Sequence, residues 1–389
     1  MKSESIGAAA KKYMMIIILV GVVIFFSILT KGKILYAQNI NNLISQNGYV
    51  FVLAAGMLLC ILTGGNIDLA VGSVVCFTGA IGGVMMSKGS SAGIAVLVML
   101  LVGLAIGCFQ GFWIAFISVP PFIATLAGMY AFRGLSNVVL QGFAVGINNQ
   151  TFLNLFGGGA DCYVPDFLST GGKLNMFCLL VGLVLALIFA LSTTLGWKSR
   201  QKKGLAGASN AEKVTLVILV ALMVWITYEL ASYKGIPTVL IWIALVLFVY
   251  NYITQNTAIG RYFYAVGGNE KATRLSGVNT KMVYFVAYAN MGFLAGLAGI
   301  LTVARASSAQ PTYGQGYEMD AIASCFIGGA SAYGGVGKIS GVIIGAVLMG
   351  VINQGMSIMG IDSNYQRVVK GIVLLLAVMF DVLSKREKK

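Results

Sequence analysis

Long apolar stretches alternate with short polar segments along nearly the whole chain of 389 residues. A helix needs roughly 20 consecutive, mainly apolar residues to cross the hydrocarbon core of a bilayer. The pattern predicts one all-α domain, residues 1–389, built as a polytopic membrane helix bundle of about 12 (10–12) transmembrane segments. The expected segments are 14–30, 46–62, 70–87, 93–117, 121–140, 174–195, 214–231, 237–254, 282–303, 319–334, 339–356 and 366–383.

The segment 319–334 is the weakest of these, because Glu318 and Asp320 stand at its start. It is either a full crossing or a re-entrant or broken helix, which is tolerated where protein or a water-filled cavity surrounds it. The two acidic residues mark either the outer mouth of a pathway or a helix start that the macrodipole favours. The many glycines around this segment predict close packing between helix backbones.

Composition and charge agree with a membrane protein. Hydrophobic residues make up 58% of the chain and charged residues only 10%, against roughly a quarter in soluble domains. Seventeen of the 26 Lys and Arg residues fall in segments that are cytoplasmic if the N-terminus is inside, and six fall in the opposite segments. This bias predicts that both termini are cytoplasmic. The net charge of +14 therefore reflects topology, and no nucleic-acid partner is expected.

No combination of residues suited to catalysis is found. The chain has no histidine, its six cysteines include no CxxC pair, and no metal-ligand spacing appears. The nearest match to a phosphate-binding loop is "SAYGGVGKIS" (331–340), which has Ala332 in place of the first Gly and Ile339 in place of Ser or Thr. We therefore expect no catalytic residue, no metal site and no cofactor in this chain.

The polar loop 254–281 differs in character from the other loops. Within it, "GGNEKATRLSGVNT" (267–280) predicts a short helix over 270–275, with Gly268-Asn269 as a start signal and Gly277 as a stop signal. The loop is either a capped surface turn or a short helix on the cytoplasmic face between two membrane segments. In the second case a partner bound to this helix could move the adjoining helices as rigid bodies.

The stretch "LTGGNIDLAVGS" (62–73) places a charge at the junction of the second and third segments. An Asp at the centre of a membrane helix costs roughly 2.5–3.5 kcal/mol. We therefore expect Asp68 to lie at a helix start, after a tight turn at Gly64 and Gly65. Asn66 is then the better candidate for contact with a transported molecule. Arg133 is a conceivable partner for Asp68, and we expect Arg367, Lys370 and Asp381 to anchor the last segment at the membrane interface.

Five motifs together resemble those of bacterial ATP-binding-cassette (ABC) importer permeases for monosaccharides, the family of ribose, xylose and galactoside permeases. In chain order they are "GGNIDLAVGS", "VPPFIATLAGMYAFRG", "YAVGGNEKATRLSGVN", "ARASSAQPTYGQGYEMDAIASCFIGGASAYGGVGKISGVIIGA" and "YQRVVKGIVLLLAV". The resemblance implies a multi-pass permease of the bacterial inner membrane that is not itself an enzyme. It also implies a second permease copy, an ATPase subunit that binds ATP and Mg, and a periplasmic or lipid-anchored sugar-binding protein as partners.

The resemblance also assigns roles to residues. It implies that the loop 254–281 couples to the ATPase through Gly268, Asn269, Glu270, Ala272, Leu275, Ser276 and Gly277. For the translocation pathway we take polar residues within or beside the apolar segments, namely Asn66, Asp68, Ser73, Thr125, Asn290 and Asp320. Residues 174–231 add two segments and a basic loop, which resembles xylose-type or multiple-monosaccharide permeases.

Two other functions remain open from the sequence. One is a secondary sugar transporter driven by protons or sodium through Asp68, Glu318 or Asp320. The other is the same type of ABC permease with a small polar cargo that is not a sugar. The sequence does not name the sugar, because selectivity in such systems rests largely on the binding protein.

Overall fold

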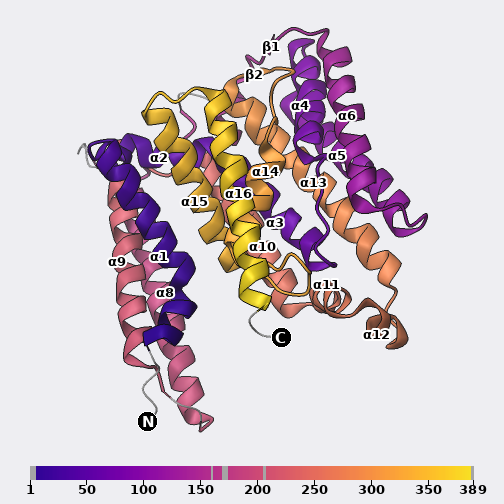
Figure 1. The fold of residues 1–389 in the computed structure, drawn as a ribbon. Helices are drawn as coiled ribbons and strands as arrows, with labels where there is room; N and C mark the ends of the chain where they lie inside the picture. Colours follow the sequence, from indigo (N-terminus) through magenta and orange to yellow (C-terminus); the bar gives the residue numbers. More distant parts are fainter. Residues whose placement is uncertain (1–5, 159–160, 169–173, 205–206, 387–389) are drawn as a thin grey trace.

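The computed structural model describes residues 6–158, 161–168, 174–204 and 207–386, and within these ranges the chain is almost entirely helical (Figure 1). One short 3₁₀ helix and one two-stranded sheet accompany the α-helices. The elements are α1 (Ile6–Leu29), η1 (Lys33–Leu35), α2 (Ala37–Gln46), α3 (Gly48–Leu62), α4 (Val71–Ser87), α5 (Ala92–Ala115), α6 (Pro121–Leu140), β1 (Val145–Gly146), α7 (Gln150–Phe156), α8 (Met176–Lys202), α9 (Asn210–Tyr233), α10 (Thr238–Asn256), α11 (Ala258–Gly268), α12 (Glu270–Leu275), α13 (Thr280–Ala306), β2 (Ser308–Ala309), α14 (Tyr317–Ile327), α15 (Ile339–Ile358) and α16 (Ser363–Arg386).

Eleven of the twelve expected segments coincide with a helix, the segment 319–334 overlaps one only in part, and the all-α class is confirmed. Within the described ranges, seven helices are long and apolar enough to cross a membrane, or eight if the bent pair α2–α3 forms one span. The helix α4 and the apolar part of α1 are shorter. The helix α14 has only 11 residues, so the weak segment 319–334 is not one continuous helix. Its chain leaves the helix after Ile327 and continues as a connector to α15.

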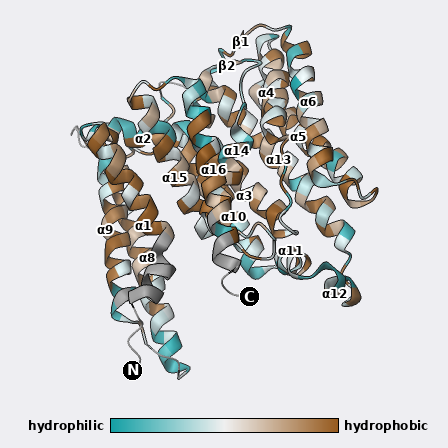
Figure 2. Cartoon of the chain, in the orientation of Figure 1, coloured by the Kyte–Doolittle hydropathy of each residue, from teal (hydrophilic) through white to brown (hydrophobic). Residues whose placement is uncertain are grey.

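The centre of the bundle consists of α3, α13 and α15. All residues of α3 are buried, and 83% of the most apolar window of α13 is buried. In α8 the corresponding share is only 11%, so most of its apolar surface faces outward, as Figure 2 shows for the helices at the left. An apolar surface of this extent suits contact with lipid, whereas α13 packs against α3, α4 and α5.

Glycines let the central helices approach closely. A Cβ atom at Gly103 of α5 would lie 2.5 Å from the carbonyl oxygen of Gly292 in α13. A Cβ atom at Gly341 of α15 would likewise lie 2.0 Å from the carbonyl oxygen of Gly328, which follows α14. The expectation that glycines around 319–334 serve helix packing is confirmed.

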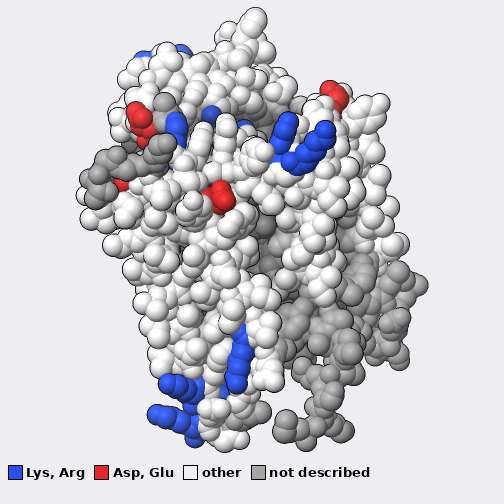
Figure 3. All heavy atoms as spheres, turned by 90° about the vertical axis from the view of Figure 1, so that its left-hand side faces the viewer, with Lys and Arg blue, Asp and Glu red and all other residues white. Residues whose placement is uncertain are grey.

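The two ends of the bundle differ. The start of α1, the end of α16 and the helices α11 and α12 lie at one end, and the β1–β2 sheet lies at the other (Figure 1). The sheet is antiparallel and pairs Val145 with Ala309. On the face shown in Figure 3, basic side chains lie at the lower end of the molecule and also in its upper part. The exposed Lys198, Arg200 and Lys202 belong to the end of α8. We use the name α12 end for the end of the bundle that carries α12.

Candidate functional site

The short helix α12 begins and ends where the sequence predicts. The side chain of Asn269 accepts a hydrogen bond from the backbone N–H of Ala272 (3.0 Å), which caps the first turn. Gly277 has a φ of +84° and donates its N–H to the carbonyl of Arg274 (3.0 Å), which ends the helix. The side chain of Asn279 then caps α13 by accepting from Met282 N (3.1 Å). The helix predicted over 270–275 is confirmed.

This helix is presented to solvent. The residues predicted to couple to an ATPase are all exposed, and they are Gly268, Asn269, Glu270, Ala272, Leu275, Ser276 and Gly277. Leu275 is 88% exposed, although it lies at an end of the molecule and not on the apolar flank. Thr273 is buried and donates to the carbonyl of Asn269 (2.8 Å). Leu275 is therefore accessible to a partner protein that docks on α12.

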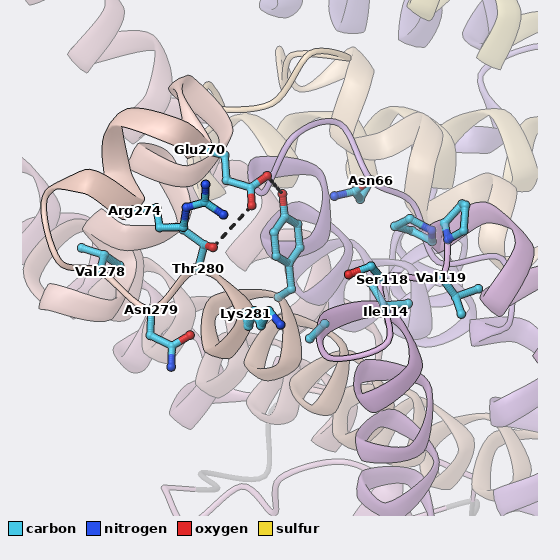
Figure 4. A pocket seen from close by; sticks show the side chains of 14 residues that line it. Asn66, Ile114, Ser118, Val119, Glu270, Arg274, Val278, Asn279, Thr280 and Lys281 are labelled. Carbon is cyan, nitrogen blue, oxygen red and sulfur yellow. Dashed lines mark hydrogen bonds between the residues drawn. The ribbon is translucent and has the colours of Figure 1, made fainter.

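A cavity of about 510 Å³ lies beside α12. On one side it is lined by the corner between α5 and α6, and on the other by α12 and the first turns of α13 (Figure 4). Asn66, from the connector between α3 and α4, also lines it, so this candidate contact residue does reach an open space. The lining residues are Asn66, Ile114, Ala115, Ser118, Val119, Pro120, Pro121, Glu270, Arg274, Val278, Asn279, Thr280, Lys281 and Tyr284.

The carboxylate of Glu270 is turned toward α13. It accepts a hydrogen bond from Tyr284 Oη (3.1 Å) and a longer one from Thr280 Oγ1 (3.4 Å) (Figure 4). Its backbone therefore belongs to the first turn of α12, while its side chain joins α12 to α13. Tyr284 was not singled out from the sequence, where aromatic residues in apolar segments give no signal of their own.

Three pairs of consecutive glycines meet at the α12 end. They are Gly64–Gly65 after α3, Gly267–Gly268 at the end of α11, and Gly334–Gly335 before α15, and we call this contact the glycine junction. The N–H of Gly335 donates to the carbonyl of Leu62 (3.0 Å). A Cβ atom at Gly267 would lie 1.8 Å from that same carbonyl oxygen, and one at Gly65 would lie 1.9 Å from the carbonyl oxygen of Ala332. The three connectors are thus in direct backbone contact.

The residues proposed for a translocation pathway do not converge on one site. Asn66 lines the cavity, whereas Asp68 is buried and accepts a hydrogen bond from Ala70 N (2.8 Å) just before α4 begins. The hydroxyl of Thr125 donates to the carbonyl of Pro121 within α6 (2.9 Å). Asn290 of α13 accepts a hydrogen bond from the Tyr250 hydroxyl of α10.

Buried polar atoms without a partner occur at three of these residues. Among the described residues, Ser73 Oγ, Asn290 Nδ2 and Asp320 Oδ1 are buried and have no hydrogen-bond partner. They lie on α4, α13 and α14 respectively, in the interior of the bundle and apart from the cavity at the α12 end. The geometry therefore joins only Asn66 to the coupling residues.

Asp320 has a tertiary partner that sequence reasoning missed. Its Oδ2 lies 2.9 Å from Lys370 Nζ of α16 and accepts a hydrogen bond from Tyr49 Oη of α3 (2.6 Å). The interpretation of Lys370 as an interfacial anchor is therefore wrong, because its ammonium group forms an ion pair with a fully buried carboxylate. Arg133 donates to the carbonyls of Pro311 and Tyr313 (3.1 and 2.6 Å), which shows that it holds the segment before α14 and not Asp68.

The described residues include no group of His, Cys, Asp and Glu side chains that is arranged to hold a metal ion. Several long apolar helices, the exposed helix α12 and the cavity beside it are the features of a multi-pass membrane transport subunit. The sequence of residues 39–378 matches the family described as branched-chain amino acid transport system / permease component. The chain belongs to this permease family, and it is a transport component of the bacterial inner membrane and not an enzyme.

Curated relatives support the same family. The chain is 34% identical to the xylose transport system permease protein XylH of Haemophilus influenzae over 377 residues, which cover 96% of this chain and 97% of the relative. It is 34% identical to XylH of Escherichia coli K12, over 96% and 92% of the two chains. It is 36% identical to the ribose import permease protein RbsC of Escherichia coli K12, over 88% and 85%. No solved structure matches the chain.

Proposed function

We propose that this chain is the translocation subunit of an ABC importer for a monosaccharide. The permease family and the relatives named for xylose and ribose transport support this proposal. The observation that carries it is the capped helix α12, which exposes all of its residues except Thr273 and is held against the first turns of the central helix α13. ATP and Mg would be bound by a separate ATPase subunit, and this chain would need no cofactor of its own.

The topology that we propose has twelve crossings, with both termini and α12 in the cytoplasm. Two observations support it. Most basic residues fall in the segments that this topology places inside, and the start of α1, the end of α16 and α12 share one end of the bundle (Figure 1). The helices α1, α4, α14 and α16 would complete the crossings as members of a bundle, although they are short or carry charged residues.

The partners follow from the two ends. An ATPase subunit docks on α12, a periplasmic or lipid-anchored sugar-binding protein docks at the end with the β1–β2 sheet, and a second copy of this chain completes a homodimer. ATP-driven closure of the ATPase would then switch the permease between outward and inward access. A neutral sugar needs hydrogen-bonding side chains beside apolar walls, and Asn66 and its cavity supply both at the inner end.

The α8–α9 hairpin favours xylose, or a broader set of pentoses and hexoses, as cargo. The chain matches xylose permeases over 96% of its length. The hairpin packs mainly on itself and on α2, as an added element would. This layout is the one that the sequence shares with xylose-type permeases.

Reconstitution of the chain into liposomes tests the proposal against an ion-coupled transporter. With its ATPase and binding protein, the permease should accumulate radiolabelled xylose or another monosaccharide only when ATP is enclosed with the ATPase. The isolated chain should accumulate no sugar under a proton or sodium gradient. Uptake by the isolated chain would overturn the proposal, and uptake of a polar cargo other than sugars would overturn the substrate class alone.

A further inference from the structure

The carboxylate of Glu270 points toward α13, although the residue belongs to the exposed helix α12. It accepts hydrogen bonds from Tyr284 and Thr280, both in the first turns of α13. We propose that Glu270 and Tyr284 are positioning residues that fix α12 to α13, so that a displacement of α12 is passed to α13 and to the connector that carries Asn66. This inference rests on the proposed function, because it assumes that α12 receives the force.

The helix α13 suits this role because it is long and enclosed. It has 27 residues, runs from α12 to the β1–β2 sheet at the opposite end, and packs against α3, α4 and α5. Packed helices move as rigid bodies, since close-packed interiors do not deform continuously. A displacement applied to its first turns is therefore transmitted along the whole helix.

The glycine junction prevents α12 from moving alone. Gly267, next to the break between α11 and α12, approaches Leu62 and Gly335 without an intervening side chain. The Tyr284 hydroxyl lies close to this junction, because a Cβ atom at Gly64 would be 3.9 Å from Tyr284 Oη. The connectors before α4 and before α15 are thus displaced together with the start of α12.

The cavity gives this motion a direction. On the side of the glycine junction the backbones are in contact, whereas toward the α5–α6 corner about 510 Å³ is open. Movement of α12 and the start of α13 toward Pro120 and Pro121 would close the space that Asn66 lines. One motion at the surface would then change access to a candidate sugar contact.

Substitutions at two residues, Tyr284 and Glu270, distinguish a positioning role from a direct contact with the ATPase. Tyr284→Phe removes only the hydroxyl and leaves the exposed face of α12 unchanged. In the reconstituted complex we expect sugar-stimulated ATP hydrolysis and uptake to fall about tenfold, with the ATPase subunit still co-purifying at the wild-type ratio. Glu270→Ala should have the same effect, and Glu270→Gln, which keeps one acceptor for the Tyr284 hydroxyl, should retain part of the activity. The matched control is Tyr252→Phe on the exposed flank of α10.

The double variant Tyr284→Phe with Glu270→Ala should be no worse than Glu270→Ala alone, since both changes remove one interaction. A merely structural role would instead lower thermal stability and weaken ATPase binding in parallel with activity. Wild-type coupling in Tyr284→Phe, with loss of ATPase binding in Glu270→Ala, would overturn the inference and make Glu270 a direct contact. Absence of ATP-dependent uptake by the wild-type complex would instead overturn the proposed function.

Discussion

Asp320 and Glu270 each carry a carboxylate that joins separate helices, but the two residues lie in very different surroundings. Asp320 is fully buried, paired with Lys370 and hydrogen-bonded to Tyr49, so that α14, α16 and α3 meet at one charge. Glu270 is exposed, accepts hydrogen bonds from two hydroxyl groups, and lies beside an open cavity.

The two contacts differ in the free energy that is needed to separate each carboxylate from its partners. A buried ion pair can be broken only by leaving a charge without a partner in a medium of low dielectric constant. A carboxylate near water can leave two hydroxyl groups and be solvated again, so its net contribution is small. The contact at Asp320 therefore contributes more to the stability of the bundle than the contact at Glu270, which positions α12 against α13 at the surface.

The largest expected effect is at the buried pair. Lys370→Met leaves Asp320 buried and without its cation, so we expect the free energy of unfolding in detergent micelles to fall by about 3–5 kcal/mol. The control is Arg367→Met on the same helix, which removes an exposed hydrogen bond to Gln315 (2.9 Å) and should cost about 1 kcal/mol or less. Combining Lys370→Met with Asp320→Asn should restore part of the loss. Equal stability of the two single variants would contradict a structural role for the pair.

The next effect is at the glycine junction. Gly267→Ala places a Cβ atom 1.8 Å from the Leu62 carbonyl oxygen, so backbones must separate, at a cost of about 1–3 kcal/mol in stability. Gly268→Ala is a control from the next position, where a Cβ atom would meet nothing within 4 Å, and it should change stability by about 0.5 kcal/mol or less. Thermal unfolding of the purified permease measures both. A similar loss in the two variants would mean that the junction is not closely packed.

The smallest effect on stability is expected on α12 itself. Leu275→Asp alters a side chain that is 88% exposed, so the free energy of unfolding should change by about 0.5 kcal/mol or less. Binding of the ATPase subunit should nevertheless weaken about tenfold or more, because the substitution removes an apolar side chain that the ATPase subunit would cover in the complex. Co-purification over a range of ATPase concentrations tests this, with Lys271→Ala on the same helix as the control. Unchanged binding in Leu275→Asp would show that Leu275 is not part of the surface on which the ATPase docks.

The sequence was most informative where the determinants are local. The helix over 270–275 was predicted to the residue, because Asn269 and Gly277 are start and stop signals that act on adjacent residues. The positions of the membrane segments followed from apolar length in the same way. The exposure of α12 also agrees with expectation.

What the sequence did not predict depends on residues that are far apart in the chain. Asp320 and Lys370 are 50 positions apart, and no periodicity relates them. The glycine junction joins three connectors that no local pattern in the sequence relates to one another. The candidate pathway residues were chosen by polarity, but the Thr125 hydroxyl donates a hydrogen bond within α6 and the Asn290 side-chain oxygen accepts one from Tyr250. Polarity marks residues that need a partner and does not reveal which partner they have.

The short helix α14 has a consequence for how the protein is made. Its 11 residues span roughly 16 Å, about half of the hydrocarbon core, and they include Asp320. Such a segment is a poor substrate for insertion by itself, because an Asp costs roughly 2.5–3.5 kcal/mol at the centre of a membrane helix. Its counter-ion is synthesised 50 residues later, in α16. The ion pair that joins α14 to α16 can therefore form only after Lys370 has been synthesised, so the last helix completes the packing around α14.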